Sequence, residues 1–450
     1  MGGWPAGDVA AELRSRVRGD VIGPADRGYD RFRAVFNARV DHRPAAVVRC
    51  ASRADIAAAL AVRADRGLPF SVRAGGGSDR AVADGGIVAD VRPLKRVMID
   101  PQARTARVGA GLTWAEMDAA TQEYGLAVTG ARVSGLGVAG VTLGGGSGWL
   151  ERLLGPTCAS LTGAEVVLAD GSVVTATEAE NPGLLWALRG GGGNFGVVTE
   201  LEFRLHPVGP DLLCGFLTYP RSQALQIARR YRDYIENAPA QAGGGLVLFP
   251  GRAGTFSVIF CYAGPAAEGE QAVAPLRALG PSLNAVTGNS YRAFQAMTDL
   301  QNPAGMRAYL RRGYLAELSD QALECAVAAA SQPASSLCQV LLTPLGGAMT
   351  RLEDTALSLR VPGTGWAYQC LSLWPPLPEL DDGNISWARS FADAMRPFAA
   401  AAPAAPAIAS SPDPGQHSPE LQRLKRRYDP DGVFLADPAP GPPALRQARP

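Results

Sequence analysis

Lysine is almost absent from this 450-residue sequence, since only Lys95 and Lys425 occur and arginine carries nearly all the positive charge. No P-loop of the form GxxxxGK[ST] is present. A nucleotide site that holds phosphates with a P-loop lysine is therefore disfavoured. The motif GxSxG is also missing, which argues against a serine hydrolase of the α/β type.

Metal-binding and disulfide patterns are missing as well. The seven cysteines are scattered without a CxxC pair, and the histidines His42, His206 and His417 lie far apart. We therefore predict no metal site and no disulfide framework, with most cysteines buried as free thiols.

The chain has no excess of either charge and no long apolar run. It carries 43 basic and 42 acidic residues, a net charge of +1, so it shows no electrostatic footprint for nucleic acid or an anionic membrane. No segment reaches about 18 uninterrupted apolar residues, and charges are spread through the N-terminal segment where a signal peptide would be apolar. The expectation is a cytoplasmic protein whose partner is a small molecule, with the oligomeric state left open.

Length and composition indicate a globular chain of two domains. A hydrophobic fraction of 47% with 19% charged residues is typical of such proteins, and 450 residues exceed the size at which one core usually stops growing. After HPVGP at 206–210 glycine thins out and longer helical patterns begin. Residues 398–415 are rich in Ala and Pro, as in a linker, and the Pro-rich tail after GVF is predicted to be disordered.

Strand-like and helical patterns alternate along both halves. Strands are predicted at AAVVRC, LPFSVRAGGG and GGIVADV, with a helix at ADIAAALAVRADRG that has Asp55 in its first turn and Gly67 at its end. RTARVGAG and AEVVLADGSVV are further strands, with a helix at WAEMDAATQEYG between them. In the second half, the helical patterns SQALQIARRYRDYIENA, GEQAVAPLRALG and SDQALECAVAAAS alternate with strand-like runs such as GLVLFP and WAYQCLSLW.

Glycine is concentrated in several loops of the first half. The turn RAGGGS at 73–78 costs backbone entropy, so either a ligand requires bare main chain there or it is a surface turn. GLGVAG at 135–140 matches GxGxxG, but VTLGGGSGW follows, with β-branched residues and glycine where the dinucleotide fingerprint needs a helix. A better interpretation is a set of loops whose N–H groups converge on a long ligand with a pyrophosphate. The alternative is tightly packed buried turns.

Several segments, in this order, resemble the berberine-bridge-enzyme-like FAD-linked oxidases of the vanillyl-alcohol-oxidase superfamily. They are VRAGGGSDRAVADGGIVADV, DPQARTARVGAGLTWAEMDAAT, GVAGVTLGGGSGWLERLLG, AEVVLADGSVVTATEAENPGLLWALRGGGGNFGVVTELEFRLHPVGP, YLRRGYLAELSD and KRRYDPDGVF. The resemblance implies an α+β, two-domain PCMH-type FAD-binding fold. Residues 1–208 would form the FAD domain, residues 209–400 a substrate domain of antiparallel sheet covered by helices, and residues 401–450 a return to the FAD domain plus a flexible tail.

The resemblance also implies which residues bind FAD. The turn that would hold the pyrophosphate comprises Arg73, Ala74, Gly75, Gly76, Gly77 and Ser78. The flavin and ribityl chain would be lined by Ser134, Gly135, Val138 and Gly140, and the ring would be supported by the loop of Gly144, Gly145 and Gly146. The adenine side would be held by Asn194, Gly196 and Val198.

The sequence departs from the family where flavin is usually attached. Gly77 stands where the family has a histidine bonded to the flavin, and Val133 stands where some members have a cysteine. The FAD is therefore predicted to be non-covalent and to be released on denaturation. On the catalytic side, Ala159 and Ser160 replace an Asp-Asn pair, and the family's catalytic tyrosine is missing.

Candidates for acid–base catalysis are His417 and Tyr368. His417 could take the place of the missing tyrosine, or it could be a solvated loop histidine. Strand alternation in GWAYQCLSLW places Tyr368 on one face with Trp366 and Trp374, which either lines a substrate pocket or is an ordinary core face. Arg312 and Tyr314 are further residues that could reach the pocket.

Three functions remain open from the sequence. The first is an FAD-dependent oxidoreductase that passes a hydride from a secondary-metabolite substrate to the flavin. The second is a non-redox cyclase or isomerase of natural-product biosynthesis, of pericyclase type, and the third is a catalytically silent binding partner. Flavin reduction by substrate with hydrogen peroxide formation, isomerisation without a colour change, or neither would distinguish them.

Overall fold

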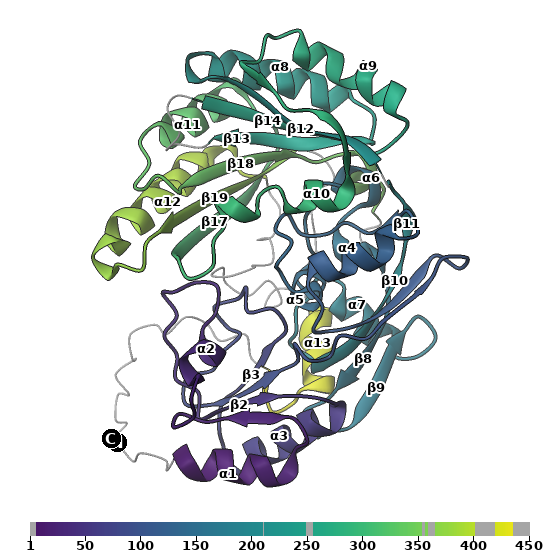
Figure 1. Cartoon of the computed structure of the whole chain (residues 1–450), viewed down its shortest axis with the longest axis vertical. Coiled ribbons are helices and arrows are strands. Elements are labelled where there is room, and N and C mark those ends of the chain that lie inside the picture. The colour runs from purple at the N-terminus through teal and green to yellow at the C-terminus, as the bar shows by residue number, and fades with distance from the viewer. Residues whose placement is uncertain are drawn as a thin grey trace.

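The computed structural model describes residues 6–209, 211–248, 255–352, 356–358, 365–400 and 419–434. Figure 1 shows two lobes stacked along the long axis of the molecule. The first lobe, coloured purple to blue, contains residues 6–209 and the yellow C-terminal helix, and the second lobe, teal to green, contains residues 211–400. The Ala/Pro-rich segment 401–418 and the tail 435–450 lie outside the described residues.

The first lobe holds two main sheets. The four-stranded sheet has the order β1-β2-β4-β3, and β2, β4 and β3 run parallel. The five-stranded sheet is antiparallel, with the order β5-β6-β10-β8-β9. The strands are β1 Asp20–Ile22, β2 Ala46–Arg49, β3 Phe70–Arg73, β4 Ile87–Asp90, β5 Val97–Asp100, β6 Thr105–Gly109, β8 Leu161–Val167, β9 Val173–Thr177 and β10 Val197–Arg204, with a small pair of β7 Leu126–Ala127 and β11 His206–Pro207.

Helices of the first lobe begin and end largely where local chemistry places them. The helices are α1 Ala6–Arg16, α2 Tyr29–Arg33, α3 Arg53–Arg66, α4 Trp114–Gln122, α5 Val138–Leu143, α6 Glu151–Leu154, α7 Pro182–Leu188 and α13 Pro419–Tyr428. α3 ends at Gly67, which takes a left-handed conformation that glycine adopts without strain. α4 begins with a capping box in which the side chains of Thr113 and Glu116 each bond the other's main-chain N–H.

One expectation from the sequence was wrong. The glycine and β-branched residues after GLGVAG argued against a helix, yet Val138–Leu143 form the six-residue helix α5. Its side chains Val138 and Val141 are buried in the core of the first lobe. Tertiary packing therefore outweighs the low helix propensity of valine and threonine here.

The second lobe is one eight-stranded antiparallel sheet with helices. Its order is β15-β12-β14-β13-β18-β19-β17, and β16 pairs with β12. The strands are β12 Asp211–Pro220, β13 Ala242–Leu248, β14 Thr255–Tyr262, β15 Leu283–Asn284, β16 Thr287–Ser290, β17 Arg307–Leu315, β18 Gln339–Pro344 and β19 Trp366–Trp374. The helices of the second lobe are α8 Ala224–Asn237, α9 Ala266–Arg277, α10 Tyr291–Ala296, α11 Asp320–Ser331 and α12 Asp381–Met395. Short 3-10 helices lie at Thr157–Ser160 in the first lobe and at Arg221–Gln223, Asp299–Gln301, Gly347–Arg351, Pro378–Leu380 and Arg396–Phe398 in the second.

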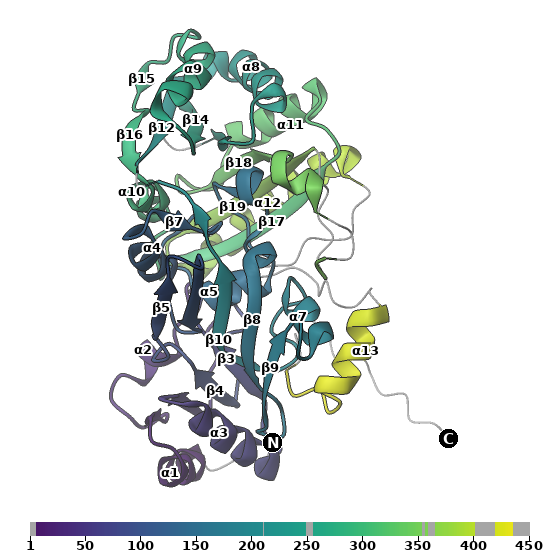
Figure 2. The same cartoon turned by 90° about the vertical axis from the view of Figure 1, so that its right-hand side faces the viewer.

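Each lobe has its own core. The core of the first lobe runs from Val9 to Leu205 and also includes Leu421, Leu424 and Phe434 from the C-terminal segment. α13 lies beside α7, as Figure 2 shows in the turned view. The core of the second lobe lies between its sheet and helices α8, α9, α11 and α12.

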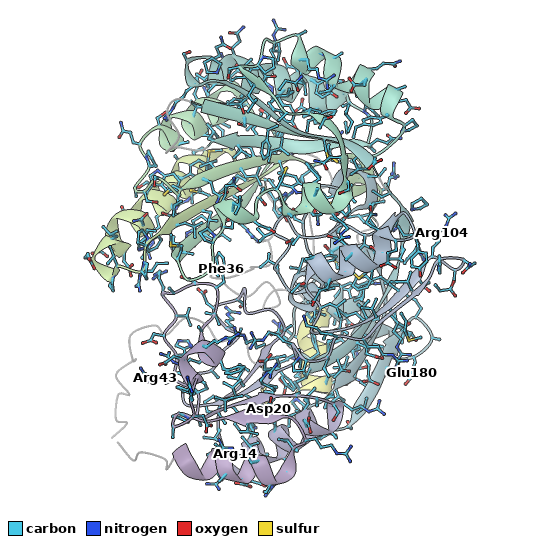
Figure 3. All side chains as sticks on the ribbon, viewed as in Figure 1. Arg14, Asp20, Phe36, Arg43, Arg104 and Glu180 are labelled. Carbon is cyan, nitrogen blue, oxygen red and sulfur yellow. The ribbon has the colours of Figure 1, made fainter. Side chains whose placement is uncertain are left out.

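The two lobes are joined by buried polar contacts. Asn37 of the first lobe donates from Nδ2 to the carbonyl of Ala308 on β17 at 3.1 Å and accepts the Ala308 N–H at 2.9 Å. The neighbouring Phe36, labelled in Figure 3 at the boundary of the lobes, packs against Leu371 and Leu373 of β19. Its N–H also donates to the carbonyl of Gly76 at 2.8 Å. This segment therefore ties the glycine turn to the sheet of the second lobe.

Across the described ranges, none of the helices is long and apolar enough to cross a membrane. The same residues contain no group of histidine, cysteine and acidic side chains that could hold a metal ion. All seven cysteines are free thiols, and all but Cys325 are buried.

Candidate active site

A cavity of about 290 Å³ in the first lobe is walled by glycine loops that are far apart in the sequence. They are the turn after β3, the segment that opens α5, and the run that precedes β10. The predicted FAD-binding residues that line it are Ala74, Gly75, Gly76, Gly77, Ser78, Gly140, Gly144, Asn194, Gly196 and Val198. The structure thus brings most of the sequence-predicted site together.

Two of these loops touch through bare main chain. A Cβ added at Gly75 would lie 2.6 Å from the N of Gly137, and one added at Gly137 would lie 2.9 Å from the N of Gly75. Real side chains do not approach main chain so closely, so both positions require glycine. The cost in backbone entropy is therefore offset by a close approach of two cavity walls.

The glycine turn also offers unused hydrogen-bond donors. In the described part of the chain, the main-chain N–H groups of Gly75, Gly76, Gly77 and Ser78 donate no hydrogen bond. Consecutive free N–H groups in a turn form a nest that binds an anion. A pyrophosphate would satisfy these donors, so the turn fits the FAD that the sequence resemblance implies.

The C-terminal segment completes the cavity. Phe434 lines it and packs edge to face on Phe70, with ring centroids 6.0 Å apart. Lys425 of α13 donates from Nζ to the carbonyl of Asn194 at 2.7 Å, to Asp429 at 2.5 Å and to the carbonyl of Phe434 at 3.2 Å. One lysine therefore holds two cavity-lining residues in place.

A second cavity, of about 140 Å³, lies between the lobes. Leu136 and Gly144 line both cavities. Its other walls come from the loops at 131–133 and 146–151 of the first lobe and from β17, β18 and β19 of the second. A ligand in the first cavity and a smaller molecule in the second would meet at this shared boundary.

The second sheet presents Arg312 and Tyr314 to this cavity, the two residues that the sequence named as able to reach the pocket. β17 and β19 pair antiparallel, with Arg312 opposite Gln369 and Tyr314 opposite Ala367, and these residues line the cavity. The alternate residues, from Trp366 to Trp374, face the helices instead: the indole N–H of Trp366 donates to Glu236, and that of Trp374 donates to Asp381. The face of Trp366 and Trp374 is thus an ordinary core face.

Tyr368 belongs to that core face. Its ring packs edge to face on Phe391 of α12 at 5.5 Å and crosses Gly313, where an added Cβ would lie 2.5 Å from the ring. Burial raises the pKa of its hydroxyl. Tyr368 lines the second cavity while its ring packs toward α12, so of the two interpretations left open by the sequence the core face holds for Trp366 and Trp374, and Tyr368 belongs to both surfaces.

Charged groups in the second cavity are arranged asymmetrically. Arg132 forms an ion pair of 2.7 Å with Glu151, and the guanidinium of Arg132 lies over the Trp149 ring. Glu151 also accepts a hydrogen bond from the hydroxyl of Ser147 at 2.5 Å. Arg312 has no hydrogen bond or ion pair to any described residue, and its Nε is buried. Burial first, and then the charge of Arg132, lower the pKa of Arg312 to about 10, so the group remains a cation at neutral pH.

Tyr314 lies close to both charged groups. Burial and the charge of Glu151 raise the pKa of its hydroxyl far above neutral pH, so Tyr314 is protonated there and can donate a hydrogen bond. Within the described lining of the two cavities there is no histidine and no cysteine.

Some predicted FAD-binding residues take other places. Arg73 points away from the cavity: it donates to the carbonyl of Phe32 and, at 2.5 Å, to that of Ala34, and burial lowers its pKa to about 10. Its side chain therefore anchors a neighbouring loop, which corrects its predicted contact with the pyrophosphate. Ser134 donates from N and Oγ to the carboxylate of Asp299 in the second lobe, at 2.9 and 2.5 Å.

The remaining predicted positions divide by their place around the cavities. Gly146 lines the second cavity, beside Gly144. Val138 is fully buried in the core, and Gly135 and Gly145 lie in the same loops without lining either cavity. His417 lies outside the described residues.

Sequence reasoning missed several lining residues. They are mainly apolar or glycine positions: Phe70, Val72, Val91, Leu136, Gly137, Ala139, Val141, Leu143, Gly190, Gly191, Gly192, Gly193 and Phe434. The run Gly190–Gly193 carried a visible signal in its four glycines. The apolar positions carried none, because a buried cavity wall and a buried core follow the same sequence pattern.

Known proteins share these features. Residues 44–177 match the protein family described as "FAD binding domain". An FAD-linked oxidoreductase of Dictyostelium discoideum is 26% identical over 408 residues, 89% of each chain. The (R)-6-hydroxynicotine oxidase of Paenarthrobacter nicotinovorans is 36% identical over 208 residues, 46% of this chain and 45% of that protein. The solved structure of wild-type BBE-like 1 of Physcomitrella patens has a TM-score of 0.84 at 20% identity and covers 95% of this chain and 97% of that one.

The first lobe therefore contains an FAD-binding domain, and the fold is the two-domain PCMH-type FAD-binding fold that the sequence predicted. The likeness to berberine-bridge-enzyme-like proteins is confirmed at the level of the fold. The chain is an enzyme similar to FAD-linked oxidoreductases, and FAD is its cofactor.

Proposed function

We propose that this enzyme holds FAD non-covalently in the glycine-walled cavity and oxidises a small organic substrate in the neighbouring cavity. The observation that carries the proposal is that the two cavities are neighbours, with Leu136 and Gly144 lining both. A flavin ring at that boundary would face the sheet of the second lobe. FAD bound there would supply the hydride acceptor.

The cofactor would be held by main chain more than by side chains. The free N–H groups of Gly75 to Ser78 suit the pyrophosphate, and the loop at Asn194, fixed by Lys425, suits the adenine end. Positioning by a rigid wall lowers the entropy that a flexible site would lose on binding. The proposed division into an FAD domain, residues 1–208 with the C-terminal return, and a substrate domain, residues 209–400, agrees with the separate cores.

Non-covalent attachment is supported by the side chains at two positions. Gly77 lines the first cavity and Val133 the second, and neither can form a bond to a flavin ring. A Cβ at Gly77 would lie 2.8 Å from Cδ2 of Leu136, so Leu136 fills the space that a larger residue would need. No histidine or cysteine occurs elsewhere in the described lining of either cavity.

The proton chemistry is assigned to the cavity-facing side of β17 and its neighbours. Tyr314 would donate a hydrogen bond to a substrate oxygen or nitrogen, since the pKa of its hydroxyl is raised. Glu151 would accept a proton from the substrate only after loosening its bonds to Arg132 and Ser147. The other candidates stay predictions: Tyr368 lines the second cavity, and His417 lies outside the described residues.

The substrate is proposed to be a secondary metabolite, by analogy with the small-molecule substrate in the name of (R)-6-hydroxynicotine oxidase. A cytoplasmic setting is consistent with the free cysteines, since disulfides are rare in reducing compartments. A non-redox cyclase or isomerase is the second candidate, because the described lining offers a protonated tyrosine and no histidine as a ready base.

Anaerobic mixing of the FAD-loaded protein with a panel of amines, alcohols and hydroxy acids tests the choice. The oxidoreductase proposal expects one class to bleach the visible flavin band, with one hydrogen peroxide formed per flavin when air is admitted. Gly75→Val, which should exclude FAD from the cavity, is the matched control and should produce neither signal. A compound that is isomerised while the flavin spectrum stays oxidised would replace the oxidoreductase with the cyclase.

A further inference from the structure

We propose that Arg312 binds a carboxylate of the substrate, so that the molecule processed in the second cavity is an organic acid in its ionised form. This inference rests on the proposed function, because it assigns the second cavity to the substrate. It names a substrate class that neither the fold nor the relatives supply.

Arg312 is a half-buried arginine that differs from the other described arginines whose Nε is buried. Six other arginines also have a buried Nε without a hydrogen-bond partner: Arg39, Arg49, Arg73, Arg132, Arg229 and Arg277. Five of them, however, place another guanidinium nitrogen on a carbonyl or carboxylate, as Arg73 does with Ala34 and Arg132 does with Glu151. The sixth, Arg39, has its Nε 3.7 Å from the carboxylate of Asp381. Arg312 makes no such bond to any described residue. Taking part of a cation out of water without a partner is costly, so a half-buried, unpaired guanidinium here requires a compensating gain.

Among the described residues, none around Arg312 supplies a compensating charge. The charged or ionisable groups that act on it are Arg132 and Tyr314, and Tyr314 is neutral. Arg132 brings its own counter-ion, Glu151, so that pair contributes no net charge. The second cavity therefore carries one uncompensated positive charge, which an anionic ligand would neutralise.

The geometry of the strand directs this charge at the cavity. Arg312 lies opposite Gln369 on β19, and both line the cavity floor. The planar guanidinium fork matches two oxygens of one carboxylate, and Gln369 adds an amide donor beside it. Leu341, Leu345 and Met349 supply an apolar wall for the rest of the molecule. An aryl or branched alkyl carboxylate fits this combination.

Isothermal titration of the full-length, FAD-loaded protein with benzoate and with benzamide tests the proposal. The two probes have the same shape and differ in charge. We expect benzoate to bind at least tenfold more tightly than benzamide, a difference of about 1.4 kcal/mol. Arg312→Gln should remove that preference, and Arg312→Lys, which keeps the charge and loses the fork, should weaken it.

The neighbouring arginine is the matched control. Arg311 lies on the same strand but on the helix side of the sheet, with its guanidinium carbon 4.9 Å from the centroid of the Tyr309 ring. Arg311→Gln removes the same charge and should leave the preference for benzoate intact. The visible and circular dichroism spectra show whether a variant has lost FAD or unfolded. If Arg312→Gln does so, the benzoate preference of Arg312→Lys tests the proposal in its place.

Three results would overturn the proposal. They are equal binding of the two probes by the wild type, a benzoate preference that survives Arg312→Gln, and a benzoate preference lost equally in Arg311→Gln. If the preference for benzoate survives Arg312→Gln while the reduction potential of the flavin shifts, the guanidinium stabilises the reduced flavin and does not bind the substrate. A protein that prefers benzoate but never takes up FAD would refute the proposed function while leaving the anion site standing.

Discussion

The bond network of Lys425 leads to a sharp prediction about the C-terminal segment. Its ammonium group bonds the carbonyls of Asn194 and Phe434, both of which line the FAD cavity, and the carboxylate of Asp429. The Asp429 side chain is fully buried, with 0% exposure, and that of Lys425 is 24% exposed. The same carboxylate accepts the N–H groups of Val433 and Phe434, so it holds the end of the chain in place.

Replacing this lysine with methionine keeps the length of the side chain and removes its charge and donors. Lys425→Met leaves the Asp429 carboxylate buried with only two main-chain donors. Breaking a buried ion pair from one side costs about 3 kcal/mol or more, so we expect the free energy of unfolding to fall by about 3 kcal/mol. We also expect the Kd for FAD to rise at least several-fold, because two cavity walls lose their anchor.

The other lysine of the chain is the matched control. Lys95 pairs with Glu116 at the surface, where the two side chains are 46% and 41% exposed. A surface pair is worth up to about 1 kcal/mol, so Lys95→Met should change unfolding by no more than that and leave FAD binding unchanged. Urea unfolding and FAD titration of both variants give the comparison. Equal effects of the two substitutions, or an unchanged Kd for FAD in Lys425→Met, would refute the reasoning.

Two further predictions follow from buried positions. Burial raises the pKa of Asp118 to about 7 from its ordinary 3.8, so near neutral pH the folded state holds a proton that the unfolded state has lost. The free energy of unfolding should therefore fall by roughly 3 kcal/mol between pH 5 and pH 8 from this group. Asp118→Asn should remove this part of the pH dependence, which urea unfolding of both proteins at pH 5 and pH 8 measures. If the urea midpoints of wild type and variant shift equally with pH, the assignment to Asp118 is contradicted. Gly75→Val places a branched side chain 2.6 Å from the N of Gly137 and should weaken FAD binding more than tenfold in a fluorescence titration. Undiminished FAD affinity in that variant would show that the two loops do not form the cofactor wall.

Local chemistry made much of the first lobe predictable. The helix that ends at Gly67 and the capping box at Thr113 depend on residues within one turn, and both are readable in the sequence. The glycine loops could also be predicted from the sequence, because only glycine fits where two main-chain segments approach as closely as Gly75 and Gly137 do. Their convergence on one cavity came from the resemblance, since no local pattern states which loops meet.

The second lobe shows where local patterns fail. A period of two residues divides β19 into two faces without indicating which face turns toward the cavity, and the face of Tyr368 turned out to pack on α12. The large aromatic residues made that face look like a ligand wall, yet they are the core. The sequence named Arg312 as a residue that could reach the pocket, but its lack of a counter-ion could not be predicted, because that depends on every neighbour brought to it by the fold.

The most direct test of the account is the visible spectrum of the purified protein before and after acid precipitation. The account predicts a yellow protein whose flavin moves entirely into the supernatant and is identified there as FAD, because Gly77 and Val133 offer no point of attachment. Yellow colour that stays in the pellet would contradict non-covalent binding. A colourless protein that also fails to take up added FAD would contradict the assignment of the glycine-walled cavity as the cofactor site.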